Sequence, residues 1–126
     1  MDTLGLVLGV AVTAASLTER AGAQVVLGRV LAWFTWLRRL WVEGGYTGPA
    51  FAAWVQALCP QLAVAVVKRS DDTTGFKVLP RRWVVERTFG WLMHHRRLVR
   101  DYENAATSAK AWIFIAMIRL QLRRLA

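Results

Sequence analysis

Short aliphatic stretches alternate along the chain with stretches of helical periodicity. Residues 6–12 (LVLGVAV), 37–42 (LRRLWV) and 62–69 (LAVAVVKR) are rich in Val and Leu without a helical repeat, which predicts three strands, the first buried on both faces. Thr18 predicts the N-cap of a helix to about residue 34, and Pro49 the first turn of a helix over 49–58. This alternation predicts an α/β fold with parallel elements, a short mixed sheet flanked by helices.

The C-terminal third of the chain is helical in pattern. Two long helices are predicted, from Arg81 to about Tyr102 and over residues 106–125. On the first helix, an apolar stripe is predicted to face the core, with Glu86 on its border; the stripe comprises Val85, Phe89, Leu92 and Met93. Arg82 precedes Glu86 by one turn, so the two side chains share one edge of this helix.

The composition indicates a chain with much apolar surface to bury. At 126 residues the length suits a single domain, and 56% of the residues are hydrophobic, including seven Trp. Three of the tryptophans are expected to pack in the core, with stacking on unpaired bases as the alternative: Trp33, Trp36 and Trp41. Cys59 is the only cysteine, which excludes an internal disulfide and a cysteine zinc site, and it is expected to be buried.

The charge of the chain is strongly basic and unevenly distributed. The net charge is +9, and residues 81–126 hold ten Lys and Arg against three acids. Such a balance favours a polyanionic partner, most often nucleic acid. We expect the main basic surface to contact the DNA backbone, with a merely solvated face as the alternative; it comprises Arg96, Arg97, Arg100, Arg119, Arg123 and Arg124.

The uncharged stretch near the N-terminus does not predict a membrane protein. Residues 3–18 carry no charge before Glu19, but this stretch lacks a basic region ahead of it and is shorter than the roughly 20 residues needed to span a bilayer. We expect no membrane association and a cytoplasmic location.

Two glutamates are the candidate metal ligands, and each also has a simpler interpretation. Glu86 either pairs with Arg82 on a solvated face or binds a metal ion beside arginines that hold phosphate. Glu43 ends the second predicted strand before Gly44, where ligands of α/β sheets gather, but a plain turn fits as well. Asp2 is expected to fray. His94 and His95 are expected at the surface or against phosphate rather than on metal.

Five motifs resemble, in order and spacing, the bacterial insertion-sequence transposases with a DDE catalytic triad. They cover nearly the whole chain: DTLGLVLGVAV, LWVEGGYTG, GFKVLPRRWVVERTFGWL, RRLVRDYE and IAMIRLQLRRL. The resemblance implies a ribonuclease-H-like fold. It also implies that two Asp and one Glu bind two divalent ions, magnesium or manganese, while the enzyme cuts the element ends and joins them to target DNA.

By this resemblance, Glu86 is the last acid of the triad and Arg82 is the basic residue that faces phosphate. Glu43 stands where the family has its second Asp, and both glutamates are then catalytic metal ligands. Asp2 matches a family Asp outside the triad, so the first catalytic Asp is expected upstream of this chain, as is the N-terminal DNA-binding region.

The chain is therefore expected to be the C-terminal part of a transposase catalytic domain, with a partial ribonuclease-H-like fold. Alone it should bind metal weakly and catalyse little, and it would act with an upstream transposase fragment or as an oligomer on DNA. The alternative is a non-enzymatic basic DNA-binding protein or regulator derived from a transposase.

Overall fold

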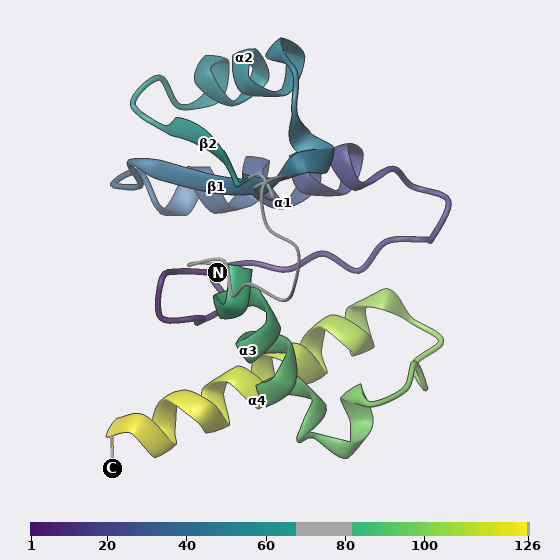
Figure 1. Cartoon of the computed structure of the whole chain (residues 1–126). Helices are drawn as coiled ribbons and strands as arrows, with labels where there is room; N and C mark the ends of the chain where they lie inside the picture. Colours follow the sequence, from purple (N-terminus) through teal and green to yellow (C-terminus); the bar gives the residue numbers. More distant parts are fainter. Residues whose placement is uncertain (68–81, 126) are drawn as a thin grey trace, which may run out of the picture. The chain divides into compact units, whose positions relative to one another are not determined.

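The described residues, 1–67 and 82–125 of a computed structural model, form two compact units (Figure 1). The central unit is Ala14–Lys77, and the terminal unit combines Met1–Thr13 with Val78–Ala126. Strands and helices both occur, so the predicted α/β class is confirmed. Lys68, Arg69 and Arg81, which the sequence placed in a strand or helix, lie outside the described residues.

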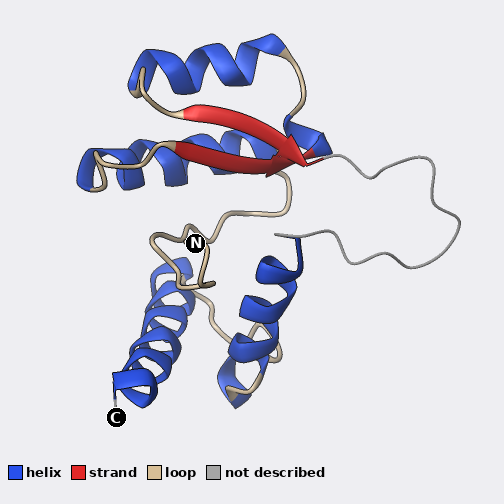
Figure 2. Ribbon diagram, turned by 60° about the vertical axis from the view of Figure 1, so that its left-hand side comes forward, coloured by secondary structure: helices blue, strands red, loops and turns tan. Residues whose placement is uncertain are grey.

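The central unit is built on a pair of parallel strands (Figure 2). Helix α1 (Glu19–Trp33) begins at Thr18, whose Oγ1 accepts a hydrogen bond from the Ala21 N–H at 3.3 Å, as predicted. Strand β1 (Arg39–Glu43) leads through a 3-10 turn, η1 (Gly44–Tyr46), into α2 (Pro49–Leu58) and then β2 (Ala63–Val67). In this register Glu43 lies opposite Val67 at the C-terminal edge of the sheet.

The core of the central unit lies between its helices and strands. Its buried members are Leu31, Phe51, Val55, Cys59 and Leu62. Cys59 is 5% exposed, which confirms the prediction that it is buried, and its N–H donates to the Val55 carbonyl at 2.9 Å to close α2. Burial of these side chains fixes the helix that follows Glu43 against the strands.

The terminal unit pairs α3 (Arg82–Met93) with α4 (Ala106–Leu125). Helix α4 has its predicted bounds, but the helix predicted to reach Tyr102 ends at Met93. Beyond it the backbone tightens: the His95 N–H donates to the Leu92 carbonyl at 3.0 Å, and a 3-10 turn, η2 (Arg96–Leu98), follows. No helix in the described parts is both long and apolar enough to cross a bilayer.

Residues 6–12 form no strand, so this prediction was wrong. In the described ranges the sheet has two strands and is parallel rather than mixed. No strand of the described ranges pairs with this segment, so it lacks the ladder of backbone hydrogen bonds that a strand requires. Val7 packs against the second core cluster, which consists of Leu92, Ala116 and Met117.

The buried face of α3 also differs from the predicted stripe. Leu92 is buried, but Phe89 and Met93 are 57% and 58% exposed, and Thr88 is 1% exposed. The reason is that the Thr88 hydroxyl finds carbonyl acceptors inside the unit, so a polar residue can occupy the inner face.

Two tryptophans that were expected in the core lie at the surface. Trp33 is 85% exposed and Trp36 is 55% exposed, while Trp41 is half-buried. Trp33 is the last residue of α1, and the Trp36 ring lies 5.0 Å from that of the neighbouring Phe34, between ring centroids. Both come after Leu31, the last buried residue of α1.

Candidate functional site

Glu86 lies on the exposed side of α3. Its side chain is 66% exposed, and its Oε1 lies 3.8 Å from Nε of Arg82, one helical turn earlier. Such a pair on a solvated face contributes only about 0.2–0.5 kcal/mol to stability. The carboxylate is therefore open to another cation, and Arg82 is open to an anion.

Glu43 is exposed at the C-terminal end of β1. It precedes Gly44 and Gly45 in η1, and a Cβ added at Gly44 would meet nothing within 4 Å. The predicted strand end and glycine turn are thus present, and the carboxylate stands where a parallel sheet presents ligands.

The turn after Glu43 is held by the start of α1, a contact that the sequence did not reveal. Arg20 donates from Nε to the Gly45 carbonyl at 3.0 Å and from Nη2 to the Thr47 carbonyl at 2.7 Å. The Tyr46 hydroxyl donates to the Glu19 carbonyl at 3.4 Å. An arginine on a helix surface has no pattern that distinguishes this role from solvation, so only the structure identifies Arg20.

Tyr46 reports the charge around this turn. Partial burial of the phenol raises its pKa above the ordinary value of 10.0, and the negative charges of Glu19 and Glu43 raise the pKa further because they oppose formation of the phenolate. The Glu43 carboxylate therefore acts electrostatically on the Tyr46 phenol.

Replacing Glu43 with glutamine should lower the pKa of Tyr46, because one of the negative charges that oppose the phenolate disappears. The chain has two tyrosines, so tyrosinate absorbance during an alkaline titration of a Tyr102→Phe background reports Tyr46 alone. Glu43→Asp is the matched control, since it keeps the charge. An unchanged pKa in Glu43→Gln would show that the Glu43 carboxylate does not face the phenol.

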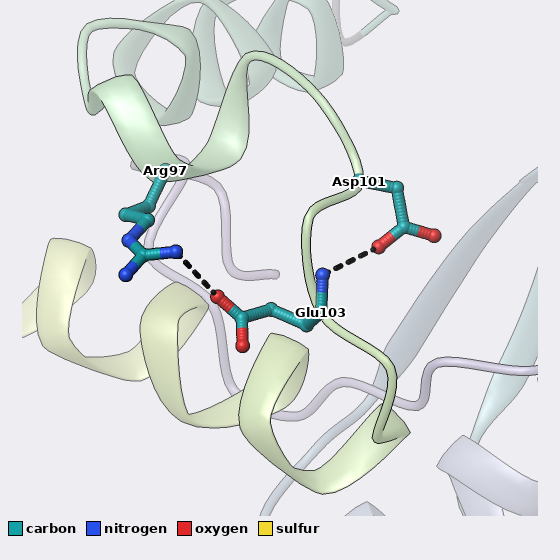
Figure 3. A network of polar contacts seen from close by, with 3 residues as sticks. All are labelled: Arg97, Asp101 and Glu103. Carbon is teal, nitrogen blue, oxygen red and sulfur yellow. Dashed lines mark hydrogen bonds and ion pairs between the residues drawn. The ribbon is translucent and has the colours of Figure 1, made fainter.

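The predicted DNA-binding arginines differ in their surroundings. Arg96 and Arg100 are exposed at and after η2. Arg97 lies 3.4 Å from Oε1 of Glu103, whose N–H donates to Asp101 Oδ1 at 3.4 Å (Figure 3). The Arg97 guanidinium also lies 5.5 Å from the Trp112 ring centroid, so it links η2 to α4. Because Glu103 partly neutralises its charge, Arg97 is less available to a phosphate than Arg96 and Arg100 are.

Arg87 was not predicted as a site residue from the sequence. It is half-buried, whereas the predicted DNA-binding residues Arg96, Arg97 and Arg100 are exposed. Its guanidinium lies 4.2 Å from the Trp83 ring centroid and 4.8 Å from that of Trp91. Arg124 covers Trp91 as well, at 4.5 Å, so this part of the expected basic surface packs on an indole. The i, i+4 spacing on either side of Arg87 is the sequence signal that could have indicated this stacking.

The structure brings Arg82 and Glu86 together, whereas Glu43 and Glu86 belong to different units. Within residues 1–67 and 82–125, no group of three or more His, Cys, Asp or Glu gathers in a way that could hold a metal ion. His94 is exposed and His95 is half-buried. Asp2 is not frayed: its Oδ1 accepts from the Leu4 and Leu6 N–H groups at 2.9 and 2.8 Å.

Comparison with known proteins identifies one family. The family model for the transposase DDE domain matches residues 1–121, nearly the whole chain. No curated protein and no solved structure matches. The match spans both glutamates and every arginine discussed above except Arg123 and Arg124. The chain therefore belongs to the transposase DDE domain family.

Proposed function

We propose that this chain supplies Glu43 and Glu86 as two metal-binding carboxylates of a transposase that cuts and joins DNA at the ends of an insertion sequence. One observation carries the proposal: Arg82 and Glu86 stand one turn apart on an exposed side of α3, in a chain that the transposase family model matches over residues 1–121. A carboxylate beside an arginine can bind a cation while the arginine holds a phosphate.

The kind of donor fits magnesium or manganese. Carboxylate oxygens are the ligands that hard cations take, and both glutamates are exposed. Bound divalent ions polarise phosphoryl oxygens and lower the pKa of an attacking water. In the proposed site Glu43 and Glu86 hold the ions, and Arg82 neutralises charge on the phosphate.

Two carboxylates are too few for chemistry that requires several to converge. We propose that an aspartate from an upstream transposase segment or polypeptide completes the set on a ribonuclease-H-like fold. Glu43 reaches about 1 Å further than the aspartate that the family resemblance implies, and misplacement of that size can cost about a hundredfold in rate. The chain alone should therefore catalyse little.

The proposed DNA contacts lie on the terminal unit. Arg96 and Arg100 are exposed beside η2 and suited to backbone phosphates, and Arg97 would contribute with the part of its charge that Glu103 leaves free. The element ends and the target DNA are the proposed partners, bound by an oligomer of the transposase.

Replacing Glu86 with glutamine should weaken binding of Mn²⁺ to the whole chain by about tenfold, since a metal-ligand oxygen is exchanged for a neutral amide. Free Mn²⁺ is measured by electron paramagnetic resonance. Asp101→Asn is the matched control, because it removes one negative charge from the same unit outside the proposed site.

Equal Mn²⁺ affinity in the wild-type chain and Glu86→Gln would contradict the metal role. If DNA then still binds with a steep salt dependence, the basic DNA-binding regulator is the better description. If the role holds, magnesium-dependent nicking should appear when the upstream segment is added, and Glu86→Gln should abolish it.

A further inference from the structure

The first residues of the chain form a closed turn. The Asp2 carboxylate accepts from two N–H groups, those of Leu4 and Leu6, at 2.9 and 2.8 Å. In the backbone, the Asp2 N–H donates to the Leu6 carbonyl at 2.9 Å, and the Gly5 N–H donates to the Asp2 carbonyl at 3.1 Å. Four hydrogen bonds within five residues fix the direction in which the Leu4 and Gly5 carbonyls point.

Those two carbonyls are bound by two adjacent residues of α3, Arg87 and Thr88. The Thr88 hydroxyl lies 2.8 Å from the Gly5 carbonyl oxygen and 2.9 Å from that of Val84, and its single proton serves both acceptors. Nη2 of Arg87 donates to the Leu4 carbonyl at 3.0 Å. The residues joined are 83 apart in sequence.

The contact is close as well as polar. Gly5 has φ +83°, and a Cβ at this position would lie 2.6 Å from Thr88 Oγ1 and 3.0 Å from the Trp91 ring. The backbone of the turn therefore lies directly against α3, where no side chain fits. Arg87 is held at the same time between the rings of Trp83 and Trp91. The helix cannot rotate about its axis without breaking these contacts.

Glu86 precedes Thr88 by two residues, so the two side chains point about 200° apart around the helix. The turn holds one side of α3, and Glu86 stands on the other with its side chain 66% exposed. We propose that the Asp2–Gly5 turn is a positioning element that sets the orientation of Glu86, and that Thr88 is its main positioning residue. This inference rests on the metal-binding role proposed for Glu86.

The test compares Thr88→Val, which keeps the shape and loses the hydroxyl, with Thr88→Ser, which keeps the hydroxyl. In Thr88→Val we expect amide exchange of Gly90 and Trp91 to accelerate and the Mn²⁺ dissociation constant of the whole chain to rise about tenfold. Thr88→Ser should restore both readouts to within about twofold of wild type, which loss of packing alone would not explain. If Thr88→Val fails to fold, Asp2→Ala loosens the same turn without changing α3.

The outcomes separate this inference from the metal role. If Glu86→Gln weakens Mn²⁺ binding but Thr88→Val and Asp2→Ala do not, the positioning role is wrong and the metal role stands. If Glu86→Gln has no effect, the metal role fails, and positioning of Glu86 toward metal fails with it. If amide exchange on α3 is unchanged in Thr88→Val, the turn does not hold the helix and the inference is overturned.

Discussion

Replacing Gly5 with alanine is expected to lower the free energy of unfolding of the terminal unit by about 2–4 kcal/mol. Two costs combine. Alanine rarely adopts a φ of +83°, and its Cβ would lie 2.6 Å from Thr88 Oγ1 and 3.0 Å from the Trp91 ring. Neither neighbour can move freely, because Thr88 is 1% exposed and Trp91 is covered by Arg87 and Arg124. Denaturant unfolding followed by circular dichroism measures the loss.

Gly90→Ala is the matched control on α3 itself. A Cβ at Gly90 meets nothing within 4 Å, and alanine favours a helix interior, so this variant should be more stable than wild type by about 0.5–1 kcal/mol. If Gly5→Ala were as stable as wild type, the turn would not lie against α3 as described.

Replacing Phe51 with alanine should destabilise the central unit by about 3–5 kcal/mol, because it opens a cavity in the middle of the core. Phe51 is 4% exposed. Its ring lies 5.2 Å from that of Tyr46 and 6.1 Å from that of Trp54, between ring centroids. The loss therefore also removes the support behind the turn that follows Glu43.

Phe89→Ala makes the same chemical change at a side chain that is 57% exposed, and it should cost less than about 1 kcal/mol. Thermal or denaturant unfolding of the two variants under the same conditions gives the comparison. Similar losses for both would mean that Phe51 does not occupy a packed core.

Local signals determined the helices that were predicted correctly. Thr18 begins α1 as a side-chain cap, Pro49 begins α2, and α4 keeps the predicted bounds over residues 106–125. Each of these helix boundaries depends on residues within one or two turns, so it can be recognised from the local sequence. The end of α3 at Met93 could not be predicted in this way, since no Gly or Pro marks it and the change is a tightening of backbone hydrogen bonds.

Long-range partners explain the errors. Residues 6–12 have a strand composition but no strand partner in the described part, and Val7 packs against the core cluster of Leu92, Ala116 and Met117 instead. Thr88, rather than Phe89, is buried on the inner face of α3, because the Gly5 carbonyl, 83 residues away, accepts a hydrogen bond from its hydroxyl. Hydrophobic periodicity contains no information about such an acceptor.

The candidate site could be predicted only in part. Composition alone left Glu43 and Glu86 with an ordinary structural explanation, and the family motifs gave them a proposed role. The structure confirms that Arg82 and Glu86 are neighbours, and adds Arg20 as the residue that holds the turn after Glu43. Arg20 donates hydrogen bonds to carbonyls 25 and 27 residues later in the chain. The periodicity of a helix gives no information about contacts at that sequence separation.

The buried Cys59 gives the central unit a chemical reporter of its own. It is the only thiol in the chain, and it closes α2 as a buried member of the core. A thiolate reacts with an alkylating reagent only when it reaches solvent, so the labelling rate of the native chain measures how often this unit opens. Because the terminal unit contains no cysteine, the labelling rate does not detect opening there, and it therefore measures opening of the central unit alone.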